Sequence, residues 1–114
     1  MKIVIAGGRD FNNYSLLNEK CDEIIDFVDV EIVSGTAKGA DSLGERYAKE
    51  NGYDVKLFPP DWKKFGPKAG PLRNKQMAEY GDMLIAFWDE KSSGTRNMIE
   101  NATNLGLIVH VINY

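Results

Sequence analysis

Short apolar segments alternate with segments of helical periodicity along almost the whole chain, and this alternation limits the possible folds more than any other feature. The expected strands are residues 2–6, 30–34, 53–58, 83–87 and 107–112. The expected helices are residues 15–27, 40–51, 71–80 and 95–105. Strands and helices in strict alternation predict a three-layer α/β domain, in which a five-stranded parallel sheet carries helices on both faces.

The polarity of each expected strand predicts its place in the sheet. Residues 3–6 and 83–87 are uninterrupted apolar runs, as central strands of a parallel sheet require. The third strand carries Asp54 and Lys56, and the last carries His110, so both suit the edges. These assignments favour the strand order 3-2-1-4-5, with a switch point between the first and fourth strands. Ligands of open α/β sheets bind at such a point, outside the carboxyl ends of the strands.

Residues that cap helices or break them mark the ends of these segments. Ser15 can cap the first helix, and Pro71 suits the first position of the third helix. A glycine often follows the end of a helix in a left-handed conformation. The glycines in that position here are Gly52, Gly81 and Gly106.

Length and composition fit one globular domain, residues 1–114, in the cytoplasm. No apolar run approaches the ~20 residues needed to cross a bilayer, so no membrane partner is expected. The opening "MKIVIAGGRD" interrupts its apolar stretch too early for a secretory signal. The one cysteine, Cys21, is expected in the core, and the one histidine, His110, within a strand. They offer no ligand cluster, so neither a metal nor a cofactor is expected.

Charge is distributed unevenly around a net charge of −3. Residues 16–31 hold six acids and one base, whereas residues 59–75 hold five bases and one acid. The basic segment overlaps the one long connection, residues 59–70, and a long loop in a small domain is usually functional. The sequence therefore predicts a cationic rim on an acidic body, suited to an anionic ligand.

Three glycine-rich turns precede expected helices at the carboxyl ends of the strands: "GGRDF", "SGTAKGAD" and "SSGTRN". The start of a helix has unpaired N–H groups and a partial positive charge, and these attract phosphate where the backbone is bare enough. The turns match neither the P-loop pattern nor G-x-G-x-x-G, which argues against magnesium-dependent P-loop chemistry and dinucleotide dehydrogenation. They predict a site for a phosphate or ribose-phosphate group.

Other side chains near these turns fit the same interpretation. Arg73 is a cation in the first turn of a helix, a position that favours bidentate contact with a phosphate. Phe11, Trp62 and Trp88 fall in the rim loops, where an aromatic face can stack on a base or merely cover the sheet. Asp41 is expected to cap its helix, or to bind a ribose hydroxyl. The expected ligand-binding residues are Gly7, Gly8, Arg9, Asp10, Phe11, Ser34, Gly35, Thr36, Lys38, Gly39, Asp41, Arg73, Trp88, Ser93, Gly94, Thr95 and Arg96.

Together, "IAGGRDF", "VSGTAKGADSLGERYA", "FPPDWKKFGPKAGPLRNKQM" and "SSGTRNMI" resemble the SLOG superfamily, and within it the YspA, YpsA-related branch. The resemblance implies a Rossmann-like domain that binds nucleotides or nucleotide-derived ligands across its glycine-rich rim, as a sensor or binding protein. Members include the Lonely Guy phosphoribohydrolases, the DNA-processing Smf proteins and domains that sense ADP-ribose derivatives. By analogy with such relatives, a homodimer is expected.

An enzyme of the phosphoribohydrolase type is the alternative, but two departures from the Lonely Guy pattern weaken it. Asn74 stands where that family has lysine, and Met98 stands at its glutamate, so the carboxylate that would stabilise an oxocarbenium-like state is missing. Asp10 and Asp89 are weak catalytic candidates; Asp10 pairing with Arg9 or Arg73, and Asp89 capping a loop, are the simpler readings. A single-stranded nucleic-acid binding module is the other alternative, which the net acidity disfavours without excluding.

Overall fold

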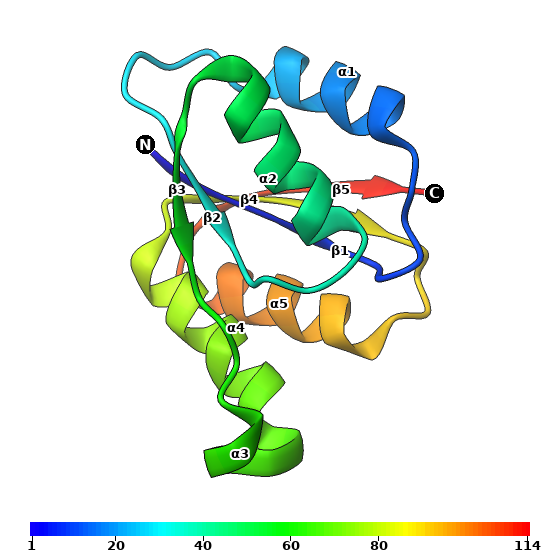
Figure 1. Ribbon diagram of the computed structural model, residues 1–114, viewed down its shortest axis with the longest axis vertical. Helices are drawn as coiled ribbons and strands as arrows, with labels where there is room; N and C mark the ends of the chain where they lie inside the picture. The colour runs from blue at the N-terminus through cyan, green and yellow to red at the C-terminus, as the bar shows by residue number, and fades with distance from the viewer.

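The computed structural model describes residues 1–114 as one α/β body with an extra helical excursion at one end (Figure 1). The strands are β1 (Lys2–Gly7), β2 (Glu31–Ser34), β3 (Asp54–Leu57), β4 (Met83–Trp88) and β5 (Ile108–Asn113). The helices are α1 (Tyr14–Ile24), α2 (Ala40–Asn51), α3 (Trp62–Phe65), α4 (Ala69–Tyr80) and α5 (Ser93–Asn104), with a 3₁₀ turn η1 (Gly66–Lys68). None of the helices is both long enough and apolar enough to span a bilayer.

The five strands form one parallel sheet in the order β3-β2-β1-β4-β5, which confirms the predicted order and fold class. Helices α1 and α2 cover one face, and α4 and α5 cover the other, so the sheet is the middle of three layers (Figure 1). The order reverses at β1, which pairs with β2 on one side and β4 on the other. The carboxyl ends of β1 and β4 therefore flank the switch point.

The core consists of two apolar clusters, one on each face of the sheet. The cluster under α1 and α2 includes Ile3, Ile5 and Cys21, and the cluster under α4 and α5 includes Val4 and Leu84. Successive residues of a strand point to opposite faces, so a strand buried on both faces must be apolar at every position. Cys21 is buried in the first cluster, as predicted. Burial of the sheet on both faces explains the uninterrupted apolar runs of the two central strands.

The start of the first helix differs from the prediction. Asn13, not Ser15, is the N-cap residue, and its Oδ1 accepts a hydrogen bond from the Leu16 N–H at 3.0 Å. The helix ends at Ile24, three residues earlier than expected, and the Ile25 backbone is extended. Asparagine and serine are equally good N-cap residues, so the sequence does not distinguish Asn13 from Ser15 as the cap.

The connection at residues 59–70 is also more ordered than predicted, because it contains α3, η1 and the start of α4. Asp61 caps α3, with its Oδ1 accepting from the Lys64 N–H at 3.1 Å. Pro71 is consequently the third residue of α4, not the first. Proline is tolerated there because the first four N–H groups of a helix have no intrahelical partner.

The glycines that follow the helices behave in two ways. Gly52 and Gly106 take the expected left-handed conformation, with φ of 72° and 82°. Gly81 instead continues in an extended conformation with φ of −83°. The chain enters β4 directly after Gly81, so no left-handed turn forms there.

Candidate functional site

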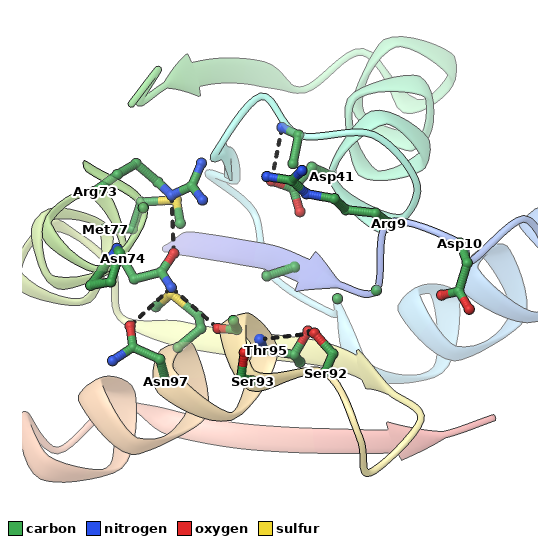
Figure 2. A pocket seen from close by; sticks show the side chains of 18 of the residues that line it. Arg9, Asp10, Asp41, Arg73, Asn74, Met77, Ser92, Ser93, Thr95 and Asn97 are labelled. Carbon is green, nitrogen blue, oxygen red and sulfur yellow. Dashed lines mark hydrogen bonds between the residues drawn. The ribbon is translucent and has the colours of Figure 1, made fainter. Parts of the chain in front are cut away.

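A cavity of about 750 Å³ opens beyond the carboxyl ends of β1 and β4, at the switch point (Figure 2). Its wall is built from the β1–α1 turn, the β2–α2 turn, α3 and η1, one face of α4, and the start of α5. The residues that line it are Ala6, Gly7, Gly8, Arg9, Asp10, Ala37, Asp41, Trp62, Pro67, Gly70, Pro71, Arg73, Asn74, Met77, Asp89, Ser92, Ser93, Gly94, Thr95, Asn97 and Met98.

The start of α5 presents free backbone amides to this cavity. Ser92 caps the helix through a hydrogen bond from the Thr95 N–H to its Oγ, at 3.3 Å. The two amides between them, of Ser93 and Gly94, have no acceptor within the protein. A Cβ added at Gly94 would meet no atom within 4 Å, so this turn is open as well as unpaired. The combination is what an oxyanion needs at the start of a helix.

Helix α4 contributes a continuous stripe to the adjacent wall. Gly70, Arg73, Asn74 and Met77 all line the cavity, and their spacing of three and four residues places them on one helical face. Asn74 is buried and connects α4 to α5, because its Nδ2 donates to the Gly94 carbonyl at 3.2 Å and to Asn97 Oδ1 at 3.0 Å (Figure 2). This amide therefore fixes the distance between the two helices that flank the cavity.

Arg73 is half-buried and held from two sides. Its Nε donates to Asn74 Oδ1 at 3.0 Å, and one terminal nitrogen donates to the Gly35 carbonyl. No carboxylate lies within ion-pair distance of the guanidinium. Burial lowers the pKa of Arg73, the neighbouring positive charge of Arg9 lowers it further, and Asp41 opposes both. A desolvated guanidinium without an ion-pair partner is suited to receive an anion.

Asp41, in the first turn of α2, is hydrogen-bonded to the preceding β2–α2 turn. Its Oδ2 accepts from the Ala37 N–H at 3.2 Å, and only 5% of the residue is exposed. Burial raises the pKa of this carboxyl to about 6, although the Ala37 N–H and the charge of Arg73 both favour the ionised form. Asp41 therefore stabilises the turn that precedes the helix and does not cap α2, whose N-cap residue is Gly39 with no side-chain hydrogen bond. The predicted capping role is wrong.

The glycines of the first two turns pack against the protein itself. The Gly8 carbonyl accepts from the N–H groups of Phe11 and Ala40, both at 3.2 Å. A Cβ at Gly39, whose φ is 74°, would overlap that same carbonyl oxygen, and a Cβ at Gly7 would overlap the Phe87 carbonyl. The bare backbone here allows the two turns to interlock, so it is not evidence of ligand approach; of the three turns, only the one at Gly94 is open.

The cavity brings together nine of the expected ligand-binding residues and leaves out eight. Those that line it are Gly7, Gly8, Arg9, Asp10, Asp41, Arg73, Ser93, Gly94 and Thr95. Those that do not line it are Phe11, Ser34, Gly35, Thr36, Lys38, Gly39, Trp88 and Arg96.

Several of the excluded side chains are occupied elsewhere. Phe11 is only 3% exposed and stacks on Phe87 with ring centroids 4.9 Å apart, so of its two expected roles it covers the sheet and does not stack on a base. The Ser34 hydroxyl donates to Glu45 at 2.6 Å. Trp88 donates its Nε1–H to the Ser92 carbonyl at 3.0 Å, and so supports the start of α5.

The comparison with known families covers the first part of the chain. Residues 1–65 match the family described as "YspA, cpYpsA-related SLOG family", which is more than half of the chain. The chain belongs to this SLOG family. Membership indicates nucleotide-related binding or processing. The match includes the first two glycine-rich turns and α3, whereas the α4 and α5 walls of the cavity lie beyond it.

Two known proteins are similar over most of this SLOG chain. The gene 61 protein of Mycobacterium phage D29 is 38% identical over 89 residues, which are 73% of this chain and 70% of that protein. The X-ray structure of DNA processing protein A (DprA) from Streptococcus pneumoniae matches 96% of this chain with a TM-score of 0.75 and 20% identity. This chain spans only 49% of that solved chain, and at this identity the likeness shows a shared fold.

The two rim carboxylates considered as catalytic candidates, Asp10 and Asp89, accept hydrogen bonds from other groups of the protein. Asp10 Oδ1 accepts from the Tyr114 hydroxyl at 2.7 Å, so it does not pair with Arg9 or Arg73, and it lies well apart from Arg73 (Figure 2). Asp89 Oδ1 accepts from the N–H groups of Lys91 and Ser92, as the loop-capping reading predicted. Those amides lower the pKa of Asp89.

The charge of the cavity also differs from the expected cationic rim. Two arginines and three aspartates line it, and the lysines between residues 63 and 75 do not. Positive charge is confined to the end at Arg73 and Arg9. Met77 and Met98, both buried, supply apolar lining, and no group of three histidines, cysteines, aspartates or glutamates is placed to hold a metal ion.

The sequence interpretation missed the α3–α4 wall and the side chains that join α4 to α5. The lining residues outside the expected ligand-binding set are Ala6, Ala37, Pro67, Gly70, Pro71, Asn74, Met77, Ser92, Asn97 and Met98. Trp62, expected in a rim loop to stack on a base or cover the sheet, and Asp89, expected as a catalytic candidate or loop cap, line the cavity too. The spacing of Gly70, Arg73, Asn74 and Met77 was the available signal, because it places them on the face that carries the arginine.

Proposed function

We propose that this cavity binds the phosphate-bearing end of a nucleotide or nucleotide-derived small molecule. The observation that carries the proposal is that the unpaired amides of Ser93 and Gly94 and the guanidinium of Arg73 open into one cavity. Two donor sets on neighbouring helices, one at a helix start and one on a side chain, can together bind an anion.

The rest of the cavity suits the remainder of such a ligand. Arg9 adds a second positive charge near Arg73, and Met77 and Met98, each 1% exposed, form the apolar base of the cavity. Ligand sites commonly combine apolar lining with a few placed polar groups, and a volume of about 750 Å³ accommodates a mononucleotide. This assignment makes the protein a sensor or binding protein for such a ligand.

Calorimetric titration with ribose 5-phosphate and with AMP tests the proposal, alongside mass spectrometry of whatever co-purifies with the protein. We expect both compounds to bind, and Arg73→Ala to weaken both at least about ten-fold, as loss of a charge-assisted hydrogen bond implies. Arg46→Ala is the matched control, because Arg46 is an exposed arginine paired with Glu50 at 2.8 Å and lies outside the cavity. Equal affinities of the two variants would contradict the assignment.

A single-stranded nucleic acid is the second candidate ligand. The exposed lysines Lys63, Lys64 and Lys68 surround Trp62 on α3 and η1, and basic loops with aromatic residues are typical of such binding. The fold shared with a protein named for DNA processing is compatible with it. Affinity for an oligonucleotide should fall steeply with salt, whereas affinity for a mononucleotide should fall much less.

Hydrolysis of an N-glycosidic bond is less well supported by the side chains. Met98 lines the cavity as a buried thioether, and Asp10 and Asp89 already accept hydrogen bonds from the protein. Incubation with nucleoside monophosphates, followed by chromatography for free base, decides whether the ligand is only bound.

A further inference from the structure

We propose that Trp62 forms the base-binding wall of the cavity, and that the ligand is a nucleoside monophosphate whose base stacks on the indole. This inference rests on the proposed function, because it assumes that the phosphate occupies the end of the cavity at Arg73 and the start of α5.

Trp62 is the one aromatic residue that lines the cavity. Phe11 is buried against Phe87, and Trp88 lies outside, so of the three rim aromatics only Trp62 lines the cavity. It is 48% exposed, which leaves much of a large apolar side chain uncovered beside a cavity. An indole in this situation can bury its free face against a planar base.

The indole packs against the start of helix α4. A Cβ at Gly70 would lie 3.4 Å from Trp62 Cη2, an ordinary van der Waals contact, so the ring edge lies beside this position of the helix. Pro67 and Pro71 line the cavity on either side of Gly70 in the sequence. The aromatic wall is therefore seated on a rigid segment and not on a free loop.

The register along α4 sets the size of the ligand. Gly70 precedes Arg73 by three residues, which is a rise of about 4.5 Å and nearly one full turn. Gly70, beside the indole, and Arg73 thus lie on one helical face, one turn apart. Neighbouring positions of this kind suit a single mononucleotide, with its base against the indole and its phosphate at the arginine.

Helix α3 is not part of the packed core. It projects beyond the sheet at one end of the molecule (Figure 1), and its residues contribute nothing to either core cluster. Its cap at Asp61 and the neighbouring prolines hold it in place. Phe65, on the same helix, is 42% exposed but does not line the cavity, so it offers a matched comparison.

The test compares AMP with ribose 5-phosphate, which lacks a base, by calorimetry on the wild-type protein, Trp62→Ala, Trp62→Phe and Phe65→Ala. We expect Trp62→Ala to weaken AMP binding roughly ten-fold or more, the size of base–aromatic stacking, and to leave ribose 5-phosphate binding within about two-fold. Trp62→Phe should retain most of the AMP affinity, and Phe65→Ala should match the wild type. AMP should also quench indole fluorescence in the wild type but not in Trp62→Phe.

The two proposals fail in different ways. Suppose that ribose 5-phosphate binds and needs Arg73, but that AMP binds no more tightly than ribose 5-phosphate does. The role of Trp62 as the base-binding wall is then wrong, and the phosphate site is retained. An equal loss of both compounds in Trp62→Ala also overturns the inference, because it would give the indole a purely structural role. If the wild type binds neither compound, or binds only oligonucleotides, the proposed function itself fails, and the inference fails with it.

Discussion

Asn74 in α4 donates its side-chain amide to the Gly94 carbonyl in the first turn of α5, at 3.2 Å. The same side chain accepts from Arg73 Nε at 3.0 Å, so one buried amide positions both the arginine and the helix start that face the cavity. The two donor sets of the site are thereby mechanically connected.

Replacement of Asn74 by alanine should therefore affect stability and binding together. We expect the free energy of unfolding to fall by about 1–3 kcal/mol, because a buried amide and its partners lose their hydrogen bonds. Phosphate affinity should fall as well, since Arg73 loses its restraint. Urea unfolding and calorimetry measure the two effects, and Lys75→Ala, an exposed neighbour, should change neither. Unchanged stability in Asn74→Ala would contradict this role.

Gly35 should control the position of Arg73 at a modest cost in stability. A Cβ there would lie 2.7 Å from an Arg73 terminal nitrogen and 2.9 Å from Asp41 Oδ2. The end of the Arg73 side chain can move at little cost, but Asp41 is buried and bonded to the Ala37 N–H, so Gly35→Ala should lose about 1–2 kcal/mol of stability and remain folded. Its affinity for ribose 5-phosphate should nevertheless fall several-fold. A folded variant with undiminished affinity would show that the placement of Arg73 does not matter.

The interlocking of the first two turns is testable at Gly39, with Gly52 as its control. Both glycines flank α2 at positive φ, 74° and 72°, but Gly52 is left-handed with ψ of 24°, whereas Gly39 has ψ of −126°, and only Gly39 faces other backbone atoms. Left-handed strain costs about 1–2 kcal/mol for a residue with a side chain. We expect Gly52→Ala to lose about that much stability, and Gly39→Ala to lose at least about 2 kcal/mol more. Equal losses would mean that the turns do not depend on close approach.

Asp41 should make stability depend on pH. Its pKa is raised by burial from 3.8 to about 6, so the native state binds this proton more tightly than the unfolded chain does. Below about pH 4 this proton contributes at most about 3 kcal/mol to the free energy of unfolding. That contribution is lost as the pH rises through about 6. Urea titrations of the wild type and Asp41→Asn between pH 4 and 7 should diverge accordingly. A difference that is constant across this range would be the contrary result.

The sequence was sufficient for the fold because each central strand is apolar at every position and each edge strand is not. The same reading located the cavity, since strand order alone places the switch point at the ends of β1 and β4. It misjudged the purpose of the glycines, however. The spacing of Gly7, Gly8 and Gly39 looks the same whether a ligand or another turn approaches, and only coordinates distinguish the two.

Residues far apart in the chain account for the other differences. Asp10 and Tyr114 are 104 positions apart, and nothing near Asp10 in the sequence predicts that hydroxyl. The helical turn at residues 62–65 depends on a cap by Asp61, in a segment whose prolines and glycines equally favour a loop. The α4 stripe was visible in the spacing, but its importance depends on α5 lying beside it.

The central claim is that the amides at the start of α5 and Arg73 bind one phosphate group. The most direct measurement is a two-dimensional ¹⁵N NMR titration of the protein with ribose 5-phosphate. We predict saturable shifts of the Ser93 and Gly94 amides and of the Arg73 Nε–H, all with one dissociation constant, and none of them in Arg73→Ala. If these three signals stay in place while those of the exposed lysines between residues 63 and 75 move, the phosphate site lies elsewhere and the account is wrong.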